Sequence, residues 1–165
     1  MLACTVCDRR YPEGPTEPWR CTCGSPLDFE QVPQPDGEPP PFSALDSRRG
    51  LWAFEEWLRG DPAVTLGEGF TPLVDAPAWD ATVKLEYVNP SGSFKDRGAT
   101  TLLSRAATFG DTRVLEDSSG NAGAAIALYA ARAGIDAEIF VPAGIAAAKR
   151  RTIERTGATA VRIDG

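Results

Sequence analysis

A lysine lies in a glycine- and serine-rich turn near the middle of the chain, in a setting that could support amine chemistry. The turn is Asn-Pro-Ser-Gly-Ser-Phe-Lys-Asp-Arg-Gly at 89–98. Ser93 and Asp96 have the spacing of a capping box, so we expect a helix to begin with Ser93 as its N-cap. The positive field at that helix start disfavours the ammonium form of Lys95 and favours the free amine of a nucleophile. A solvated lysine on a well-capped helix is the alternative.

A second stretch, Ser-Ser-Gly-Asn-Ala-Gly at 118–123, could hold an anion. Its small side chains leave backbone N–H groups open at the expected start of the next helix, where a substrate carboxylate can be held. The residues concerned are Ser118, Ser119, Gly120, Ala122 and Gly123. The alternative is a serine N-cap on an alanine-rich helix.

The third group is a set of four cysteines, Cys4, Cys7, Cys21 and Cys23, in a chain without histidine. Two close pairs separated by a short polar loop are typical of a four-thiolate zinc ribbon, although the second pair is Cys-x-Cys instead of Cys-x-x-Cys. Two disulfides are the alternative, but no secretion signal precedes the cysteines. We expect a structural zinc, because four thiolates fill its shell and leave no position for water.

The turn at 89–98 closely resembles the cofactor-lysine motif of threonine synthases, members of the fold type II (tryptophan synthase β-like) enzymes that use pyridoxal 5'-phosphate. Leu-Gly-Glu-Gly-Phe-Thr-Pro-Leu at 66–73 and the stretch at 118–123 resemble the same family's other signatures, in the expected order. The resemblance covers about 44–165. The cysteine-bearing N-terminus is similar to the short zinc-ribbon extension of some members.

The resemblance implies roles for single residues. Lys95 would be the Schiff-base lysine and the catalytic acid and base, with Phe94 beside the cofactor and Asn121 bonded to its ring hydroxyl oxygen. On the residues alone, and not from the resemblance, Glu68 is expected to be a solvated turn carboxylate, and Asp96 and Arg97 to be structural. Substrate would be bound by Ser118, Ser119, Gly120, Asn121 and Thr71.

The implied reaction is that of a lyase of threonine biosynthesis, which converts O-phospho-L-homoserine and water to L-threonine and phosphate. A cysteate synthase, a threonine dehydratase and a catalytically silent zinc-ribbon binding module remain alternatives. We find no glycine-rich loop of the family's phosphate-binding kind and no group to face the ring nitrogen. We therefore expect the N-terminal portion of a longer enzyme, as a cloned fragment, a truncated gene product or a split reading frame, which is inactive alone.

Alternating strands and helices must position these groups. Strands are expected at 82–88, 112–116, 136–141 and Thr159–Ile163, and helices at 93–109, Asn121–Ala133 and 145–156. This order predicts an α/β fold with a doubly wound parallel sheet. Ligands collect beyond the carboxyl ends of such strands, so Lys95 and Asn121 are expected to converge although they are 26 positions apart.

Three segments are expected along the chain. Residues 1–31 would form the zinc-ribbon-like domain, 32–43 a proline-rich linker, and 44–165 the N-terminal part of the catalytic domain. An amphipathic helix at 48–59 is expected to bury its large aromatic residues in the core.

Composition narrows the class of partner. The net charge is −6 and only three lysines occur, which disfavours nucleic acid as the partner. The family resemblance implies a small phosphorylated amino acid as the substrate. No apolar run of membrane-spanning length and no signal peptide is found, so a cytoplasmic location is expected. A homo-oligomer of the full-length form is left open.

Overall fold

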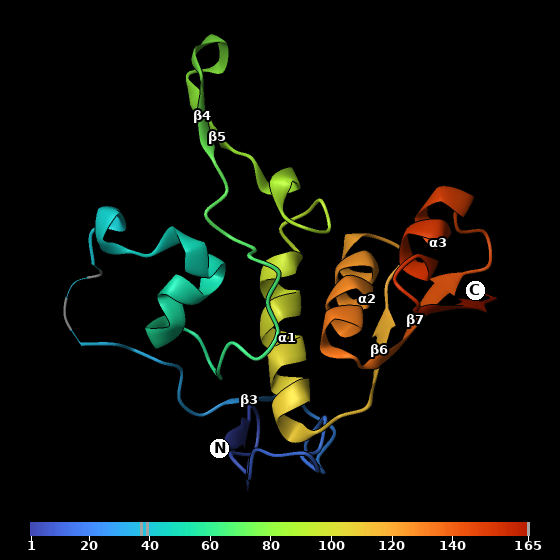
Figure 1. Cartoon of the computed structure of the whole chain (residues 1–165). Helices are drawn as coiled ribbons and strands as arrows, with labels where there is room; N and C mark the ends of the chain where they lie inside the picture. Colours follow the sequence, from blue (N-terminus) through green and yellow to red (C-terminus); the bar gives the residue numbers. More distant parts are fainter. Residues whose placement is uncertain (37, 39, 165) are drawn as a thin grey trace.

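The computed structural model describes residues 1–36, 38 and 40–164, in three parts (Figure 1). A small antiparallel sheet comes first, then a middle region of 3-10 helices with a β-hairpin, and last an α/β layer. The expected linker at 32–43 includes residues 37 and 39, which lie outside the described residues, as does residue 165.

The N-terminal sheet consists of β1 (Leu2–Cys4), β2 (Arg10–Tyr11) and β3 (Leu27–Phe29), in the order β2-β1-β3. Both pairings are antiparallel. The buried apolar residues of this part are few, namely Leu2, Cys4 and Cys21. A unit with so small a core needs a staple such as a metal ion to be stable.

The middle region contains the 3-10 helices η1 (Phe42–Ala44) and η2 (Ser47–Trp57). The prediction of an amphipathic α-helix at 48–59 is wrong, since the structure has a 3-10 helix there. This helix, η2, is kinked at Gly50 (φ 57°) and Phe54. A Cβ at Gly50 would lie 2.3 Å from the carbonyl oxygen of Glu68. The close approach of that loop needs the left-handed conformation that only glycine adopts readily. The core position expected for the aromatics holds for Trp52, which is 2% exposed.

The strand expected at 82–88 is shorter and pairs differently. It is β5 (Ala81–Lys84), which pairs antiparallel with β4 (Leu73–Ala76) in a separate hairpin joined through η3 (Pro77–Trp79). The chain then continues into η4 (Glu86–Val88). Alternating apolar and polar side chains predict a strand but not the strand with which it pairs. Pairing with a segment nearby in the sequence closes a short loop and so loses the least conformational entropy. The hairpin projects away from the rest of the chain (Figure 1).

The α/β layer agrees with the remaining expectations to within a few residues. Its helices are α1 (Asp96–Phe109), α2 (Asn121–Ala133) and α3 (Ala147–Glu154). Gly110 and Gly134 end the first two in the left-handed conformation. The strands are all parallel, in the order β6 (Arg113–Asp117), β7 (Asp136–Pro142) and β8 (Thr159–Ile163).

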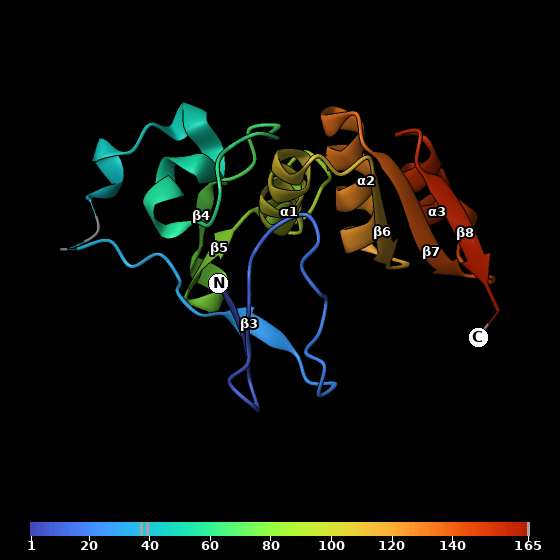
Figure 2. The same ribbon diagram turned by 90° about the horizontal axis from the view of Figure 1, so that it is seen from below.

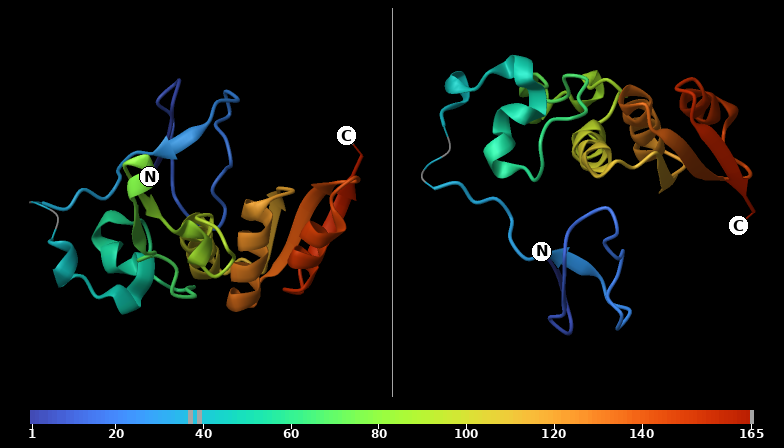
Figure 3. Two further views of the ribbon diagram at one scale, coloured as in Figure 1. Left: turned by 90° about the horizontal axis from the view of Figure 1, so that it is seen from above. Right: turned by 60° about the horizontal axis from the view of Figure 1, so that its bottom comes forward.

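The described sheet is covered on one face. The strand order follows the chain, so both right-handed crossovers place their helices, α2 and α3, on the same side (Figures 2 and 3). On the other face Leu115 is 62% exposed and Ile163 is 42% exposed. The structure thus shows a mixed α/β fold with a parallel sheet. The second covered face of a doubly wound fold is not seen among the described residues.

The core lies between the helices and the sheet. Leu103 of α1, Tyr129 of α2 and Ile139 of β7 are fully buried in it. Small residues such as Ala125 let α1 and α2 pack side by side, so their N-terminal ends are held at one end of the layer (Figure 1). No helix among the described residues is long and apolar enough to cross a membrane.

Candidate active site

Lys95, and not Ser93, is the N-cap residue of α1, and no side chain caps this helix. The predicted capping box of Ser93 and Asp96 is therefore wrong. The Asp96 carboxylate accepts hydrogen bonds from the backbone N–H of Ser91, at 2.7 Å, and from the Ser91 hydroxyl. Gly92, with φ of 86°, turns the chain so that Ser91 and not Ser93 meets the carboxylate. The exposed Lys95 amine lies 4.6 Å from the centre of the Phe94 ring, which is close enough for a cation–π contact.

The start of α2 is open to an anion. Its N-cap is Gly120, and no side chain caps the helix, so the serine-capped alternative does not hold. The Ser118 hydroxyl instead accepts from the Gly120 N–H, at 3.2 Å. A Cβ at Gly123 would lie 2.6 Å from the carbonyl oxygen of Ser118 and 2.8 Å from the Ile139 side chain. Glycine therefore lets this helix start lie directly against the preceding loop.

The two helix starts lie at the same end of the layer, the end at which β6 and β7 terminate (Figure 1). Lys95 and Asn121 are placed there, as expected, but Lys95 follows η4 and not a strand of the parallel sheet. Glu116 of β6, which sequence reasoning did not single out, is near enough to interact with Lys95. Burial and the charge of Asp117 raise the pKa of the Glu116 carboxyl, and the Lys95 ammonium opposes that rise.

Thr71 is 5% exposed and belongs to a polar cluster beside the lysine turn. Its hydroxyl donates to Glu86 at 2.5 Å, and Arg97 donates to both oxygens of the same carboxylate at 2.8 and 2.9 Å. These bonds, those from Arg97 above all, lower the pKa of Glu86 to about 2. Arg97 thus pairs with a neighbouring carboxylate, as its structural role predicts. Sequence reasoning missed Glu86, since nothing local marks it as the partner of Arg97.

Glu68 was expected to be solvated, and this expectation is wrong, because Glu68 is 0% exposed. Its carboxylate accepts from the N–H of Leu66 at 2.9 Å and from the Tyr129 hydroxyl at 2.8 Å. The glycine that follows it offers the only local hint. Gly69 has φ of 104°, and a Cβ there would lie 2.6 Å from the backbone nitrogen of Leu51. The loop is pressed against η2, which takes Glu68 out of water.

The four cysteine thiols converge in the N-terminal sheet. Their Sγ atoms all lie within 4.8 Å of one another, with Cys4–Cys23 and Cys7–Cys21 contacts of 3.6 Å. All four are free thiols, so the disulfide alternative is not seen. Sulfurs bound about 2.3 Å from a tetrahedral zinc lie about 3.8 Å apart, so the spacing fits such an ion. The N–H of Val6 and that of Cys7 each donate to Cys4 Sγ at 3.4 Å.

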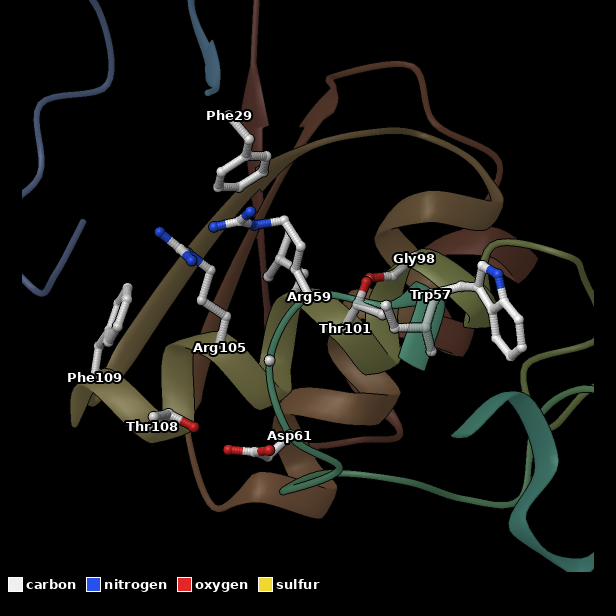
Figure 4. Close-up of a pocket in the computed structure, with 12 residues that line it drawn as sticks. Phe29, Trp57, Arg59, Asp61, Gly98, Thr101, Arg105, Thr108 and Phe109 are labelled. Carbon is white, nitrogen blue, oxygen red and sulfur yellow. The ribbon is translucent and has the colours of Figure 1, made fainter. Parts of the chain in front are cut away.

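A cavity of about 570 Å³ lies along α1, between β3 and η2 (Figure 4). Phe29 of the N-terminal sheet faces Arg59 and Arg105 there, with the Arg59 guanidinium 4.0 Å from the centre of its ring. Glu13 accepts from both arginines, at 2.6 and 3.1 Å. These contacts join the cysteine-bearing sheet to α1, so the cavity marks a joint between two parts of the chain.

Comparison with known proteins agrees with this geometry. Residues 64–165 match the family described as pyridoxal-phosphate dependent enzyme, so the chain belongs to this family. The resemblance to threonine synthases is also confirmed.

Two curated relatives and one solved structure illustrate the similarity. A threonine synthase of Synechocystis sp. is 44% identical over 113 residues, which are 63% of this chain and 30% of that protein. A threonine synthase of Methanocaldococcus jannaschii is 32% identical over 181 positions, covering 100% of this chain and 44% of that protein. The crystal structure of O-ureido-L-serine synthase gives a TM-score of 0.53 at 32% identity, over 58% of this chain and 33% of that one. The chain thus spans less than half the length of the curated relatives it matches.

Proposed function

We propose that the chain is the lysine-bearing part of a threonine synthase, which converts O-phospho-L-homoserine and water to L-threonine and phosphate. One observation carries the proposal. The Lys95 turn and the open start of α2 lie at the same end of the layer, in a segment that matches the pyridoxal-phosphate dependent enzymes. The similarity to threonine synthases supports the choice of substrate.

The residues present fit pyridoxal phosphate, which when bound supplies an electron sink for charge that develops on the substrate. Lys95 is exposed at the helix start, and within the described ranges its amine has no ion-pair partner, so it is free to attach the cofactor. Phe94 would lie beside the ring, and the Asn121 amide would donate to the ring hydroxyl oxygen. Gly123 supplies the close approach that lets α2 begin at the floor of the site.

The substrate would be held by the start of α2. Backbone N–H groups there, uncapped by any side chain, would bind its carboxylate, with Ser118, Ser119 and Gly120 shaping the loop. Lys95, once free of the cofactor, would move protons at the α and β carbons while phosphate leaves the γ carbon. Thr71, held by Glu86, would border the substrate.

The proposal includes the organisation of the chain. Residues 1–31 would bind a structural zinc through Cys4, Cys7, Cys21 and Cys23. Residues 32–43 would connect this unit to residues 44–165, which would contribute to a catalytic domain with a doubly wound sheet. We propose a cytoplasmic enzyme that acts on a small phosphorylated amino acid. Nucleic acid is not proposed as a partner, since the net charge is −6. A cysteate synthase, a threonine dehydratase and a silent binding module remain the alternatives.

Substitution of the lysine tests the proposal. In a full-length form that contains these residues, Lys95→Ala should abolish both the cofactor's borohydride-fixed attachment and phosphate release from O-phospho-L-homoserine. Lys149→Ala, on α3, is the matched control and should preserve both. Attachment at full occupancy in the Lys95→Ala variant would assign the cofactor to another lysine. Phosphate release from O-phosphoserine alone would favour the cysteate synthase.

A further inference from the structure

We propose that Tyr129 is a positioning residue for Lys95, because its hydroxyl joins the buried carboxylates of Glu68 and Asp96 into one network that fixes the lysine turn. The role assigned to Lys95 rests on the proposed function. The network itself is seen directly in the contacts of three side chains that come from distant parts of the sequence.

The three side chains are each 0% exposed. The Tyr129 hydroxyl lies 2.8 Å from Glu68 Oε2 and 3.4 Å from Asp96 Oδ2. Tyr129 belongs to α2, Glu68 to the loop before β4, and Asp96 to the first position of α1. One hydroxyl therefore connects α2 to two of the three stretches that carry the family resemblance, 66–73 and 89–98.

The hydroxyl has one proton to offer two carboxylates. It donates to Glu68, the nearer acceptor, and places a dipole between two buried negative groups that would otherwise face each other unshielded. Burial, followed by the bond to Glu68, raises the pKa of Tyr129 far above its ordinary value, so the phenol keeps its proton.

The other groups that face the pair are few. Glu68 also accepts from Thr65 and from the N–H of Leu66, and Asp96 accepts from Ser91. Arg97 supplies the nearby positive charge, although its guanidinium is paired with Glu86. Removal of the Tyr129 hydroxyl would thus leave the carboxylates without their shared donor.

Asp96 connects this network to the lysine. It is the neighbour of Lys95, and its carboxylate holds Ser91 at the other end of the turn, so a shift of Asp96 changes the conformation of 91–95. Tyr129 also follows Asn121 by eight residues on the same helix. The network therefore sets the Lys95 turn relative to the start of α2.

The test uses the 165-residue chain and its three lysines. The protein is treated with pyridoxal phosphate and borohydride, and the pyridoxyl group on Lys95, Lys84 and Lys149 is measured by peptide mass spectrometry. Tyr129→Phe keeps the buried ring, and we expect it to lower labelling of Lys95 about fivefold relative to the other lysines, the order expected for one lost hydrogen bond. Tyr87→Phe, at a tyrosine that is 68% exposed, is the matched control and should change nothing.

A rescue separates positioning from mere packing. Glu68→Gln in the Tyr129→Phe background removes one buried charge and supplies an amide donor, so Lys95 labelling should recover. Equal labelling of Lys95 in wild type and Tyr129→Phe overturns the proposal, as does a loss at Lys95 that the double variant does not reverse. If circular dichroism shows that Tyr129→Phe is unfolded, the same labelling is measured on the double variant. Failure of the double variant to regain both the fold and the labelling of Lys95 overturns the proposal.

A second readout does not depend on the cofactor. Without the hydroxyl, the two buried carboxyl groups lose their shared donor, so the melting temperature of Tyr129→Phe at pH 7 should lie below that of wild type, while that of Tyr87→Phe should match wild type. Equal melting temperatures of Tyr129→Phe and wild type overturn the network. If pyridoxal phosphate labels Lys95 of the wild-type protein no more than Lys84 and Lys149, the proposed function is contradicted. The melting temperatures then test the role of Tyr129 independently of the cofactor.

Discussion

At the scale of single residues, buried or half-buried carboxylates shape the surroundings of the lysine. Glu68 and Glu86 each accept from a donor in another segment of the chain, and Asp96 accepts from Ser91 within the lysine turn. The bidentate contact of Arg97 with Glu86 fixes the residue two positions after Lys95. In the proposed function the lysine carries the chemistry, while these acids hold the backbone around it.

We predict that Glu86→Gln lowers the free energy of unfolding by about 1 kcal/mol at pH 7, after allowance for a side chain that is 25% exposed. The pKa of Glu86 is lowered from 4.5 to about 2, so its stabilising contribution is complete above pH 4.5 and is lost as pH falls toward 2. Urea unfolding at pH 7 and pH 3 should therefore show a smaller difference from wild type at the lower pH.

Glu55→Gln is the matched control for this experiment, because Glu55 pairs with Arg49 on the surface and is 46% exposed. It should have little effect at either pH. A loss of stability for Glu86→Gln that is the same at both pH values would contradict the electrostatic origin.

The residues that sequence reasoning found and missed differ in how local their information is. Lys95, Asn121 and the cysteines are marked by type and spacing within a few positions. Tyr129 and Glu68 are 61 positions apart, and their contact depends on how α2 packs. The glycine after Glu68 hints at a close approach of the backbone but gives no indication of a partner so distant, so the contact with Tyr129 could not be predicted.

At the scale of elements, helices and strands of the α/β layer could be predicted because their periods are regular and glycines end the helices. The hairpin β4–β5 could not, since alternation in 82–88 fits either kind of sheet. The type of η2 was also missed. Its kink depends on the approach of the Glu68 loop to Gly50, which is a tertiary contact.

The N-terminal sheet leads to a prediction about metal. Protein purified without chelator should contain about one zinc per chain and should show four reactive thiols only after the metal is removed. Cys4→Ser should abolish zinc binding, because Cys4 is 2% exposed and its sulfur contacts that of Cys23. Metal analysis together with thiol titration measures both quantities.

Glu13→Gln is the control for the zinc prediction. It weakens the pairs with Arg59 and Arg105 that join the sheet to α1, but leaves the cysteines unchanged, so zinc should remain. Protein that is free of metal with all four thiols reactive at purification would contradict the zinc site.

At the scale of the whole molecule, several of the described apolar side chains remain at the surface, among them residues of the hairpin region and of the sheet. Leu73 and Trp79 of the hairpin region are 68% and 79% exposed, and Leu115 and Ile163 lie on the uncovered face of the sheet. Exposed apolar side chains on a sheet face that no helix covers favour contact with further protein. The aligned parts of this chain correspond to 30% and 44% of the two curated relatives.

The last prediction is that these 165 residues alone do not turn over O-phospho-L-homoserine. We assign the open start of α2 to the substrate carboxylate, which leaves the cofactor phosphate with no assigned partner in the described part of the chain. Anchoring of that phosphate by backbone N–H groups orients the ring over the reacting bond, and orientation is a large share of catalysis. Pyridoxal phosphate at Lys95 should therefore be weakly held and open to water, since Lys95 and Phe94 are both exposed. With excess cofactor and substrate, phosphate release should equal that of the Lys95→Ala control, and steady turnover above it would show that the chain holds the phosphate through residues not assigned to it.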